Sequence, residues 1–217
     1  MKIIYEDNHL VVVDKPAGLS VLPDGWEKDS DFLVKRLEKQ YGKIFVVHRL
    51  DKITSGVMFF ARDAETHRAL NTQFENHEAQ KTYHAILQGN PKWEEKITKY
   101  PLRSNVGHKH RTMVDDKHGK PSETRFRVIK RYEESALVEA KPMTGRTHQI
   151  RVHAYALGHP LVEDVLYGAQ DLYGLPHPML HAQSLSFIHP VTKESMKFSA
   201  PHPADFEEAL KILQGIW

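Results

Sequence analysis

Residues 46–57 read Val-Val-His-Arg-Leu-Asp-Lys-Ile-Thr-Ser-Gly-Val, a polar turn between two strongly apolar stretches. Apolar composition predicts strands at Ile44–Leu50 and Val57–Ala61, and the second is a continuous apolar run of the kind that is buried on both faces of a sheet. The carboxylate of Asp51 therefore belongs to a tight turn between two strands, two residues after Arg49.

Two interpretations fit Asp51. A turn aspartate often accepts hydrogen bonds from nearby backbone N–H groups, and that role needs no function. A charge beside apolar strands is nevertheless costly unless something pairs with it. The structural interpretation also leaves the adjacent Arg49 unexplained, so both interpretations stay open on this segment alone.

Two further segments carry side chains suited to chemistry. Tyr83 lies on a predicted strand, Thr82–Leu87, with Ala85 and Leu87 on its face. A core or cleft-wall aromatic is the simplest reading of that tyrosine.

Residues 144–153 read Thr-Gly-Arg-Thr-His-Gln-Ile-Arg-Val-His, a glycine-containing loop that leads into a predicted helix. His148 and Arg151 are three residues apart and share a helical face. Such a loop-to-helix junction could bind phosphate through its side chains and the helix terminus together. An exposed amphipathic helix start fits the same pattern.

The remaining pattern favours an α+β fold with a mixed, largely antiparallel sheet and interspersed helices. Residues 88–122 are polar and rich in Gly and Pro, which predicts a long excursion around short strands. We expect further strands at Ile3–Tyr5, Leu10–Val13, Glu123–Ile129, Ser135–Lys141, Leu185–Ile188 and Met196–Phe198, and helices at Phe32–Tyr41, Asp63–Asn76 (with Asp63 as N-cap), Thr147–Leu157 and Ala204–Ile216.

Composition is that of a soluble globular protein of one domain or two lobes, with 217 residues, 40% apolar and 27% charged. No apolar run approaches the roughly 20 residues that cross a bilayer. Cysteine is absent, which excludes disulfides, thiolate nucleophiles and Cys-based zinc sites. We expect a cytoplasmic protein with no membrane association.

Positive charge is concentrated in one segment. Residues 103–131 contain nine Lys or Arg against three acids, a net charge of +6 with His neutral, whereas the whole chain carries +2. The rest of the chain is therefore at −4. A local basic patch of this kind can hold phosphates, and a solvated, lysine-rich loop would look the same.

Nucleotide-binding and nucleophile-elbow motifs are missing from the sequence. The fifteen histidines include His177 and His181 at helical spacing, and His108 and His110 at strand spacing. Neither pair comes with the remaining ligands of a known metal motif. We therefore expect neither a metal site nor a cofactor.

Taken together, these segments resemble the ribosomal large subunit pseudouridine synthase A (RluA) type of pseudouridine synthase over almost the whole chain. The matching motifs are, in chain order, Asp14-Lys15-Pro16-Ala17-Gly18, His48-Arg49-Leu50-Asp51, Thr54-Ser55-Gly56, Lys81-Thr82-Tyr83, Gly119-Lys120-Pro121, Gly145-Arg146-Thr147-His148-Gln149-Ile150-Arg151-Val152-His153, Gly158-His159-Pro160, Leu166-Tyr167-Gly168, His181-Ala182 and Ala200-Pro201.

The resemblance implies roles for individual residues. Asp51 matches the catalytic aspartate, Tyr83 the active-site tyrosine, and Arg151 the basic residue that pairs with the aspartate. Arg49 matches an arginine that holds the target nucleotide out of its stack. The other residues that we expect to contact RNA, from the same motifs and the basic segment, are His48, Arg146, His148, Lys109, Arg111 and Lys120.

The resemblance also implies a bent sheet that a catalytic cleft divides into two lobes, with flanking helices. On this basis residues 1–217 form one catalytic domain without the N-terminal S4-type RNA-binding domain of many relatives. Two positions depart from the usual pattern: Ile53 stands where an acidic or polar residue is more usual, and Glu163 where glycine is common. We expect Glu163 to alter a turn or RNA contacts.

The implied function is conversion of specific uridines in structured RNA, ribosomal or transfer RNA, to pseudouridine. We expect a monomer without an obligate protein partner. The N1–C1′ bond breaks, the base turns, and C5 takes the place of N1, so no redox partner is required. The target nucleotide must be flipped out of its stack at a cost of roughly a few kcal/mol. Two other hypotheses are a non-catalytic RNA-binding module on the same fold and a histidine-metal hydrolase.

Overall fold

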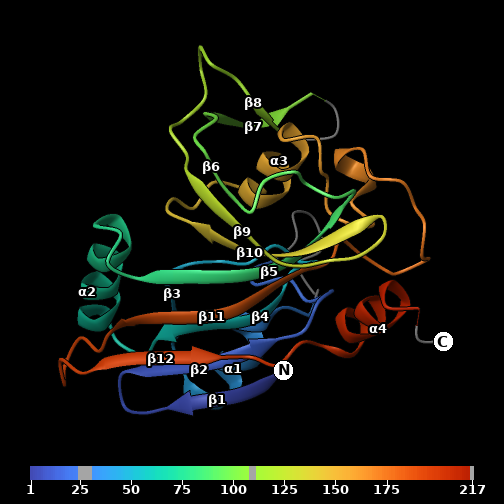
Figure 1. Cartoon of the computed structure of the whole chain (residues 1–217). Coiled ribbons are helices and arrows are strands. Elements are labelled where there is room, and N and C mark those ends of the chain that lie inside the picture. Colours follow the sequence, from blue (N-terminus) through green and yellow to red (C-terminus); the bar gives the residue numbers. More distant parts are fainter. Residues whose placement is uncertain (24–30, 108–110, 216–217) are drawn as a thin grey trace. The chain divides into compact units, whose positions relative to one another are not determined.

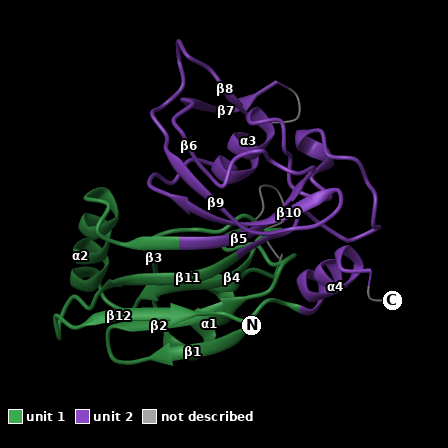
Figure 2. Ribbon diagram, in the orientation of Figure 1, with its two compact units in different colours: residues 1–81, 182–203 green, residues 82–181, 204–217 purple. Residues whose placement is uncertain are grey.

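The computed structural model of the chain describes residues 1–23, 31–107 and 111–215. In these residues the protein has four α-helices, a short 3-10 helix and a large, mostly antiparallel sheet (Figure 1). The α+β class expected from the sequence is confirmed. The chain divides into two compact units, one of residues 1–81 and 182–203 and the other of residues 82–181 and 204–217 (Figure 2).

Unit 1 is built on an antiparallel sheet and two helices. Its strands pair in the order β1, β2, β4 and the later part of β11, while β3 also pairs with β4 and β12 with β11. The bounds are β1 Lys2–Glu6, β2 Leu10–Lys15, α1 Leu33–Tyr41, β3 Phe45–Val46, β4 Ser55–Ala61, α2 Ala64–Glu75, β11 Leu180–Ile188 and β12 Ser195–Ser199.

The core of unit 1 forms where α2 packs on the sheet. All seven residues of β4 are buried, which confirms the strand expected to be covered on both faces. Leu70 of α2 joins Val57 and Phe59 of β4 in one apolar cluster. The helix begins as predicted, because Asp63 Oδ1 accepts the backbone N–H of Thr66 at 2.7 Å.

Gly56 allows β4 to approach β11 closely. Its φ is +111°, in the region that favours glycine, and a Cβ built there would lie 2.3 Å from the carbonyl oxygen of Ala182. That contact is with backbone and cannot be relieved by a rotamer change. The glycine of the Thr-Ser-Gly tripeptide is therefore required by the fold, independently of any reaction.

Gly56→Ala is expected to lower the free energy of unfolding by about 2–3 kcal/mol, because overpacking and backbone strain act together. Urea denaturation monitored by circular dichroism measures the change. Gly42→Ala provides the control, since Gly42 also has a positive φ (+72°) but no atom within 4 Å of the added Cβ. Equal losses in the two variants would show that strain alone, rather than the approach to Ala182, makes Gly56 necessary.

Unit 2 contains a second stretch of antiparallel sheet, in the order β5, β10, β9, β6, and a separate hairpin of β7 and β8. The bounds are β5 Gln80–Gln88, β6 Glu95–Thr98, β7 Leu102–Val106, β8 Arg111–Val114, β9 Thr124–Arg131, β10 Ser135–Pro142, α3 Gln149–Ala156, the 3-10 helix η1 Val165–Tyr167, and α4 Ala204–Leu213. Strands β6, β7 and β8 are the short strands expected within residues 88–122.

The two faces of this sheet are covered by different helices. Ala85 and Leu87 of β5 belong to an apolar cluster with Ile150 of α3. Ile86, on the opposite face, belongs to a cluster with Phe206 of α4. The period-two alternation of β5 thus explains why a strand with almost no exposed residue lies between α3 and α4.

Several expected boundaries differ from the structure, and two of the differences are large. The strand expected at Ile44–Leu50 is only Phe45–Val46, and β11 begins at Leu180 rather than Leu185. The early end of β3 has a visible cause, because the ring Nε2 of His48 accepts the N–H of Phe59 on β4 at 3.2 Å. The imidazole of His48 thus takes the place of a backbone acceptor in the hydrogen bonding between β3 and β4.

No α-helix within the described ranges is long and apolar enough to span a membrane.

Candidate active site

Asp51 begins a tight turn that ends at β4 in unit 1. Its backbone carbonyl accepts the N–H of Thr54 at 3.0 Å, and the carbonyl of the next residue, Lys52, accepts the N–H of Gly18 at 2.8 Å. Leu50 is buried beneath the turn, while Asp51 itself is only partly buried. The carboxylate therefore stands on a turn that is fixed through backbone atoms.

A buried lysine strengthens this arrangement. Lys15 is fully buried, and its Nζ donates to the carbonyl oxygens of Pro16, Leu19 and Lys52 at 2.9, 2.8 and 3.2 Å. Burial lowers the pKa of Lys15 to about 8, and the nearby charge of Asp51 acts in the opposite direction. Lys15 thus joins the 15–19 loop to the turn of Asp51 and places a positive charge near that carboxylate.

The two residues that precede Leu50 differ in their surroundings. The side chain of Arg49 is exposed. The ring of His48 is partly buried and packs on Phe59 and Phe74 with centroids 4.9 and 5.1 Å apart. Burial, together with the positive charge of Lys81, lowers the pKa of His48 to about 3. His48, which we predicted to contact RNA, is a neutral acceptor for the backbone of β4 at neutral pH.

Acidification is expected to destabilise the protein through His48. The unfolded chain protonates this ring near pH 6.5, whereas the folded chain keeps it neutral down to about pH 3. Between these values the unfolded state binds the extra proton, so the free energy of unfolding falls as the pH falls, by at most about 1.4 kcal/mol per pH unit. Urea denaturation at pH 7 and pH 5 measures the effect.

His48→Gln can still accept from Phe59 but does not titrate, and it should remove up to about 2 kcal/mol of the loss between pH 7 and pH 5. An unchanged acid slope in this variant would contradict the assignment of the slope to His48.

Tyr83 lies on β5, opposite Ala140 of β10. Its partly buried ring packs on the cluster of Ala85 and Leu87, the two residues expected on its face. The same cluster contains Ile150, the residue before Arg151 on α3. Strand β5 and helix α3 therefore hold Tyr83 and Arg151 on one apolar framework within unit 2.

Arg151 is held by two neighbours. Its Nε and Nη2 each donate to a carboxylate oxygen of Asp164 at 2.7 Å, and its guanidinium lies over the ring of Tyr167, 4.9 Å from the centroid. Arg151 is 4% exposed and Asp164 is completely buried. A two-point, charge-assisted contact of this kind leaves a guanidinium little freedom to turn.

Tyr167 also ties the loop before α3 to the β7–β8 hairpin. Its hydroxyl accepts the backbone N–H of Thr112 at 3.0 Å and contacts Nδ1 of His148 at 2.8 Å. His148 has a left-handed backbone (φ +53°), so the helix begins at Gln149 rather than at Thr147 as predicted. His148 thus precedes the helix and does not share a helical face with Arg151 as predicted, although both side chains contact Tyr167.

The buried side chain of Gln149 shapes the loop that carries Arg146. Its Oε1 accepts from the hydroxyl of Thr144 at 2.6 Å and from the N–H of Arg146 at 3.1 Å. Its Nε2 donates to the carbonyl of Glu123 at 2.9 Å. These bonds satisfy both ends of a buried amide and fix the backbone just before the helix.

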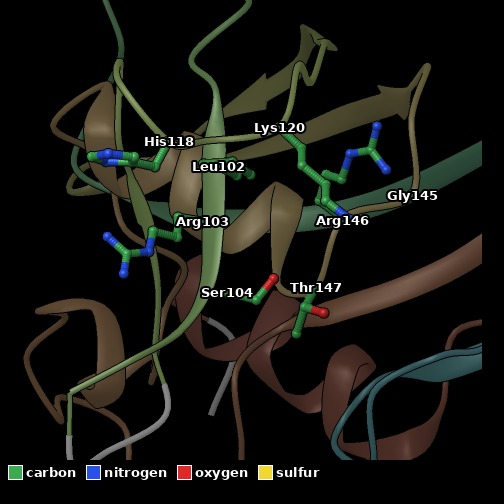
Figure 3. A pocket seen from close by; sticks show the side chains of 8 residues that line it. All are labelled: Leu102, Arg103, Ser104, His118, Lys120, Gly145, Arg146 and Thr147. Atoms are coloured by element: carbon green, nitrogen blue, oxygen red, sulfur yellow. The ribbon is translucent and has the colours of Figure 1, made fainter.

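The other predicted RNA contacts lie in unit 2. Lys120 and Arg146, which are 26 residues apart, line one pocket (Figure 3). Arg111 is partly buried at the start of β8, and Lys109 lies outside the described residues.

Glu163 occupies a position that favours glycine. Its φ is +63°, and its buried carboxylate accepts the N–H groups of Leu172 and Tyr173 at 3.3 and 2.7 Å. Burial and a hydrogen bond with Asp171 raise the pKa of Glu163. Glu163 thus takes up a backbone conformation that glycine would adopt without strain, and its side chain holds the backbone of residues 172 and 173.

Sequence reasoning missed the residues that support the predicted site. Lys15, Asp164 and Tyr167 all lie within matched or neighbouring motifs, yet no role followed from their spacing. The one available signal was Lys15, a charged residue two positions after the apolar run of residues 10–13. Among the described residues, no group of three or more His, Asp or Glu is arranged to hold a metal ion. His177 instead pairs with Asp205, Nε2 to Oδ2, at 2.7 Å.

Comparison with solved structures gives the class of the protein. The human RNA pseudouridylate synthase domain containing 4 protein aligns with a TM-score of 0.80 and 25% identity, covering 98% of this chain and 93% of that one. The human domain containing 1 protein aligns at 0.78 and 27%, covering 100% and 87%. The fold is that of a pseudouridine synthase.

Sequence comparison agrees along most of the chain. The profile of the RNA pseudouridylate synthase family matches residues 9–156. The dual-specificity RNA pseudouridine synthase RluA of Escherichia coli K12 is 38% identical over 206 residues, 94% of this chain and 93% of the relative. The ribosomal large subunit pseudouridine synthase C of Vibrio cholerae is 37% identical over 215 residues, 96% and 68%. The chain belongs to the RNA pseudouridylate synthase family, and it is an RNA-modifying isomerase.

Proposed function

We propose that Asp51 is the catalytic carboxylate of this pseudouridine synthase, with Tyr83 and Arg151 completing the site, and that its substrates are uridines in structured ribosomal or transfer RNA. The observation that carries the proposal is the fixed turn of Asp51, which is held by backbone bonds and by the buried ammonium of Lys15. The relatives named above are a dual-specificity RNA enzyme and a ribosomal large subunit enzyme, which supports ribosomal RNA as one of the substrate classes.

The reaction requires little from the protein beyond placement and one reactive carboxylate. Asp51 acts at the ribose or at the base while the N1–C1′ bond breaks. The freed uracil turns and C5 bonds to C1′, after which the C5 proton must leave. Tyr83 stacks on the base and assists this proton transfer, directly or through water. Arg151, oriented by Asp164, pairs with the Asp51 carboxylate and holds its direction.

The target base must leave its stack before any of these steps. Arg49, whose side chain is exposed beside the Asp51 turn, is suited to hold the nucleotide out. Loops, where bases are already splayed, lower the cost of flipping and are therefore the preferred sites. The enzyme works in the cytoplasm as a monomer and needs no metal or cofactor, because the product is an isomer of the substrate.

Release of tritium from C5-labelled uridine tests the proposal. RNA from cells that lack such enzymes is incubated with wild-type protein or with Asp51→Ala. Release by the wild type alone is the expected result, and chelator should not change it. Tight, salt-sensitive binding without release from ribosomal or transfer RNA would instead favour a binding module. Sensitivity to chelator would favour the metal hydrolase.

A further inference from the structure

Unit 2 contains a cationic pocket of about 420 Å³, formed by three segments that are distant in sequence. Strand β7 contributes Arg103 and Ser104, the turn after β8 contributes His118 and Lys120, and the loop before α3 contributes Arg146 and Thr147 (Figure 3). A space of this size lies within the range of roughly 300–1,000 Å³ that is usual for ligand pockets.

The pocket is fixed in place by the backbone around Gly119. Leu102 and Lys120 exchange two backbone hydrogen bonds, at 2.9 and 2.8 Å, which seat the turn on β7. A Cβ at Gly119 would lie 2.3 Å from the carbonyl oxygen of Asp115 and 2.7 Å from the backbone of Pro101. Glycine is therefore needed for the approach that brings Lys120 to the pocket.

The charges of the lining favour an anion. Arg103, Lys120 and Arg146 are permanently positive at neutral pH. One carboxylate contacts the group: Asp115 lies 3.3 Å from Arg103 and 3.6 Å from His118. Two positive charges thus remain in excess with His118 neutral. Neighbouring cations repel one another, and a bound anion relieves that repulsion.

The lining also provides hydrogen-bond donors in a defined geometry. Arg146 uses Nε to donate to the carbonyl of Pro121 at 3.1 Å, which restricts the guanidinium, and its Nη1 and Nη2 groups are further donors. Ser104 and Thr147 present hydroxyl groups (Figure 3). Guanidinium and hydroxyl groups both donate hydrogen bonds that the oxygens of a phosphate accept.

We propose that this pocket binds a phosphodiester group of the RNA substrate, together with its ribose, at a nucleotide other than the one that is isomerised. The inference rests on the proposed function for the identity of the polymer. Among the described lining residues, His118 has the only ring, so the pocket lacks the aromatic platform on which bases stack. The pocket contacts the sugar-phosphate backbone of the RNA, which positions the RNA without selecting a base sequence.

Two pocket variants, Lys120→Ala and Arg146→Ala, test the proposal against Lys211→Ala, which removes an exposed lysine from α4 outside the pocket. Binding is measured with each change in an Asp51→Ala background as a function of salt, using the same C5-tritiated RNA as in the release assay. Each pocket variant should weaken binding roughly tenfold or more. The slope of log affinity against log salt should fall by about 0.7–0.9. The control should stay within about twofold of wild type.

Kinetics with the Asp51 residue intact provide a second readout. The pocket variants should raise KM with kcat unchanged, because the contact is made equally in the ground and transition states. Arg146→Lys keeps the positive charge but lacks the two-point donor geometry of a guanidinium. Compared with Arg146→Ala, it should restore the salt slope and only part of the affinity. The melting temperature of each variant is measured to check that it folds. Lys120 is exposed, so its replacement should leave the melting temperature unchanged.

The outcomes separate the two proposals. Tritium release by the wild type, combined with pocket variants that match Lys211→Ala in affinity and salt slope, would overturn the phosphate pocket and leave the isomerase intact. A loss of kcat with unchanged KM would also overturn it. Absence of release by the wild type would defeat the assignment of Asp51, while the salt slopes would still decide whether the pocket holds an RNA phosphate.

Discussion

Asp51→Asn is expected to reduce the rate of tritium release by about 10⁴-fold or more, because an amide can act neither as a nucleophile nor as a general base at the nucleotide. The substitution keeps the size of the side chain, so the loss reports chemistry. RNA affinity of the variant should stay within about tenfold of wild type, since Asp51 contributes no positive charge to phosphate binding.

The fold should tolerate this change. The turn is held through the backbone carbonyls of Asp51 and Lys52 and through Lys15, none of which the substitution removes. Asp116→Asn, at an exposed position of the turn after β8, is the matched control and should release tritium at the wild-type rate. Residual release by Asp51→Asn within tenfold of wild type would assign the catalytic carboxylate to another residue.

Asp164→Ala is expected to destabilise the protein by about 3–5 kcal/mol, since it removes one member of a buried ion pair. Arg151 is 4% exposed, and water cannot take the place of a carboxylate that accepts two of its N–H groups. The free energy of unfolding is measured by urea denaturation. Activity should fall as well, because the remaining contact with the ring of Tyr167 does not fix the guanidinium in its plane.

Asp164→Asn separates stability from positioning. The amide oxygen can accept one N–H of Arg151, so part of the stability should return while the two-point contact stays lost. Asp116→Ala should change the free energy of unfolding by no more than about 0.5 kcal/mol, as is usual for exposed positions. A loss below about 1 kcal/mol in Asp164→Ala would show that other groups satisfy the buried guanidinium.

Most of the fold could be predicted because periodicity and burial agree along the chain. The continuous apolar run of β4, the alternation of β5 and the N-cap at Asp63 each predict a local structure that tertiary packing then keeps. One error, the early end of β3, occurs where a side chain competes with the backbone. His48 ends β3 by accepting from Phe59, and no count of apolar residues anticipates a histidine in the place of a strand.

The site could be predicted only in part, for a similar reason. The positions of Asp51, Tyr83 and Arg151 follow from ordered motifs. Their supports lie at larger separations, as with Asp164, which is thirteen residues after Arg151 and immediately precedes η1. Spacing in sequence does not indicate such a pair, because it forms only when η1 and α3 pack. The pocket of Lys120 and Arg146 is likewise a product of tertiary structure.

The buried ammonium of Lys15 has a consequence for local opening. Its three acceptors lie on both the 15–19 loop and the turn of Asp51, so neither segment can detach without leaving a charge in an apolar interior. In native-state hydrogen exchange, the amides of Gly18 and Thr54 should therefore exchange together, in one cooperative opening. Burial lowers the pKa of Lys15 to about 8, so above that pH the open state binds more protons than the closed state and opening becomes less favourable. These amides should therefore exchange more slowly at pH values above about 8 than base catalysis alone predicts.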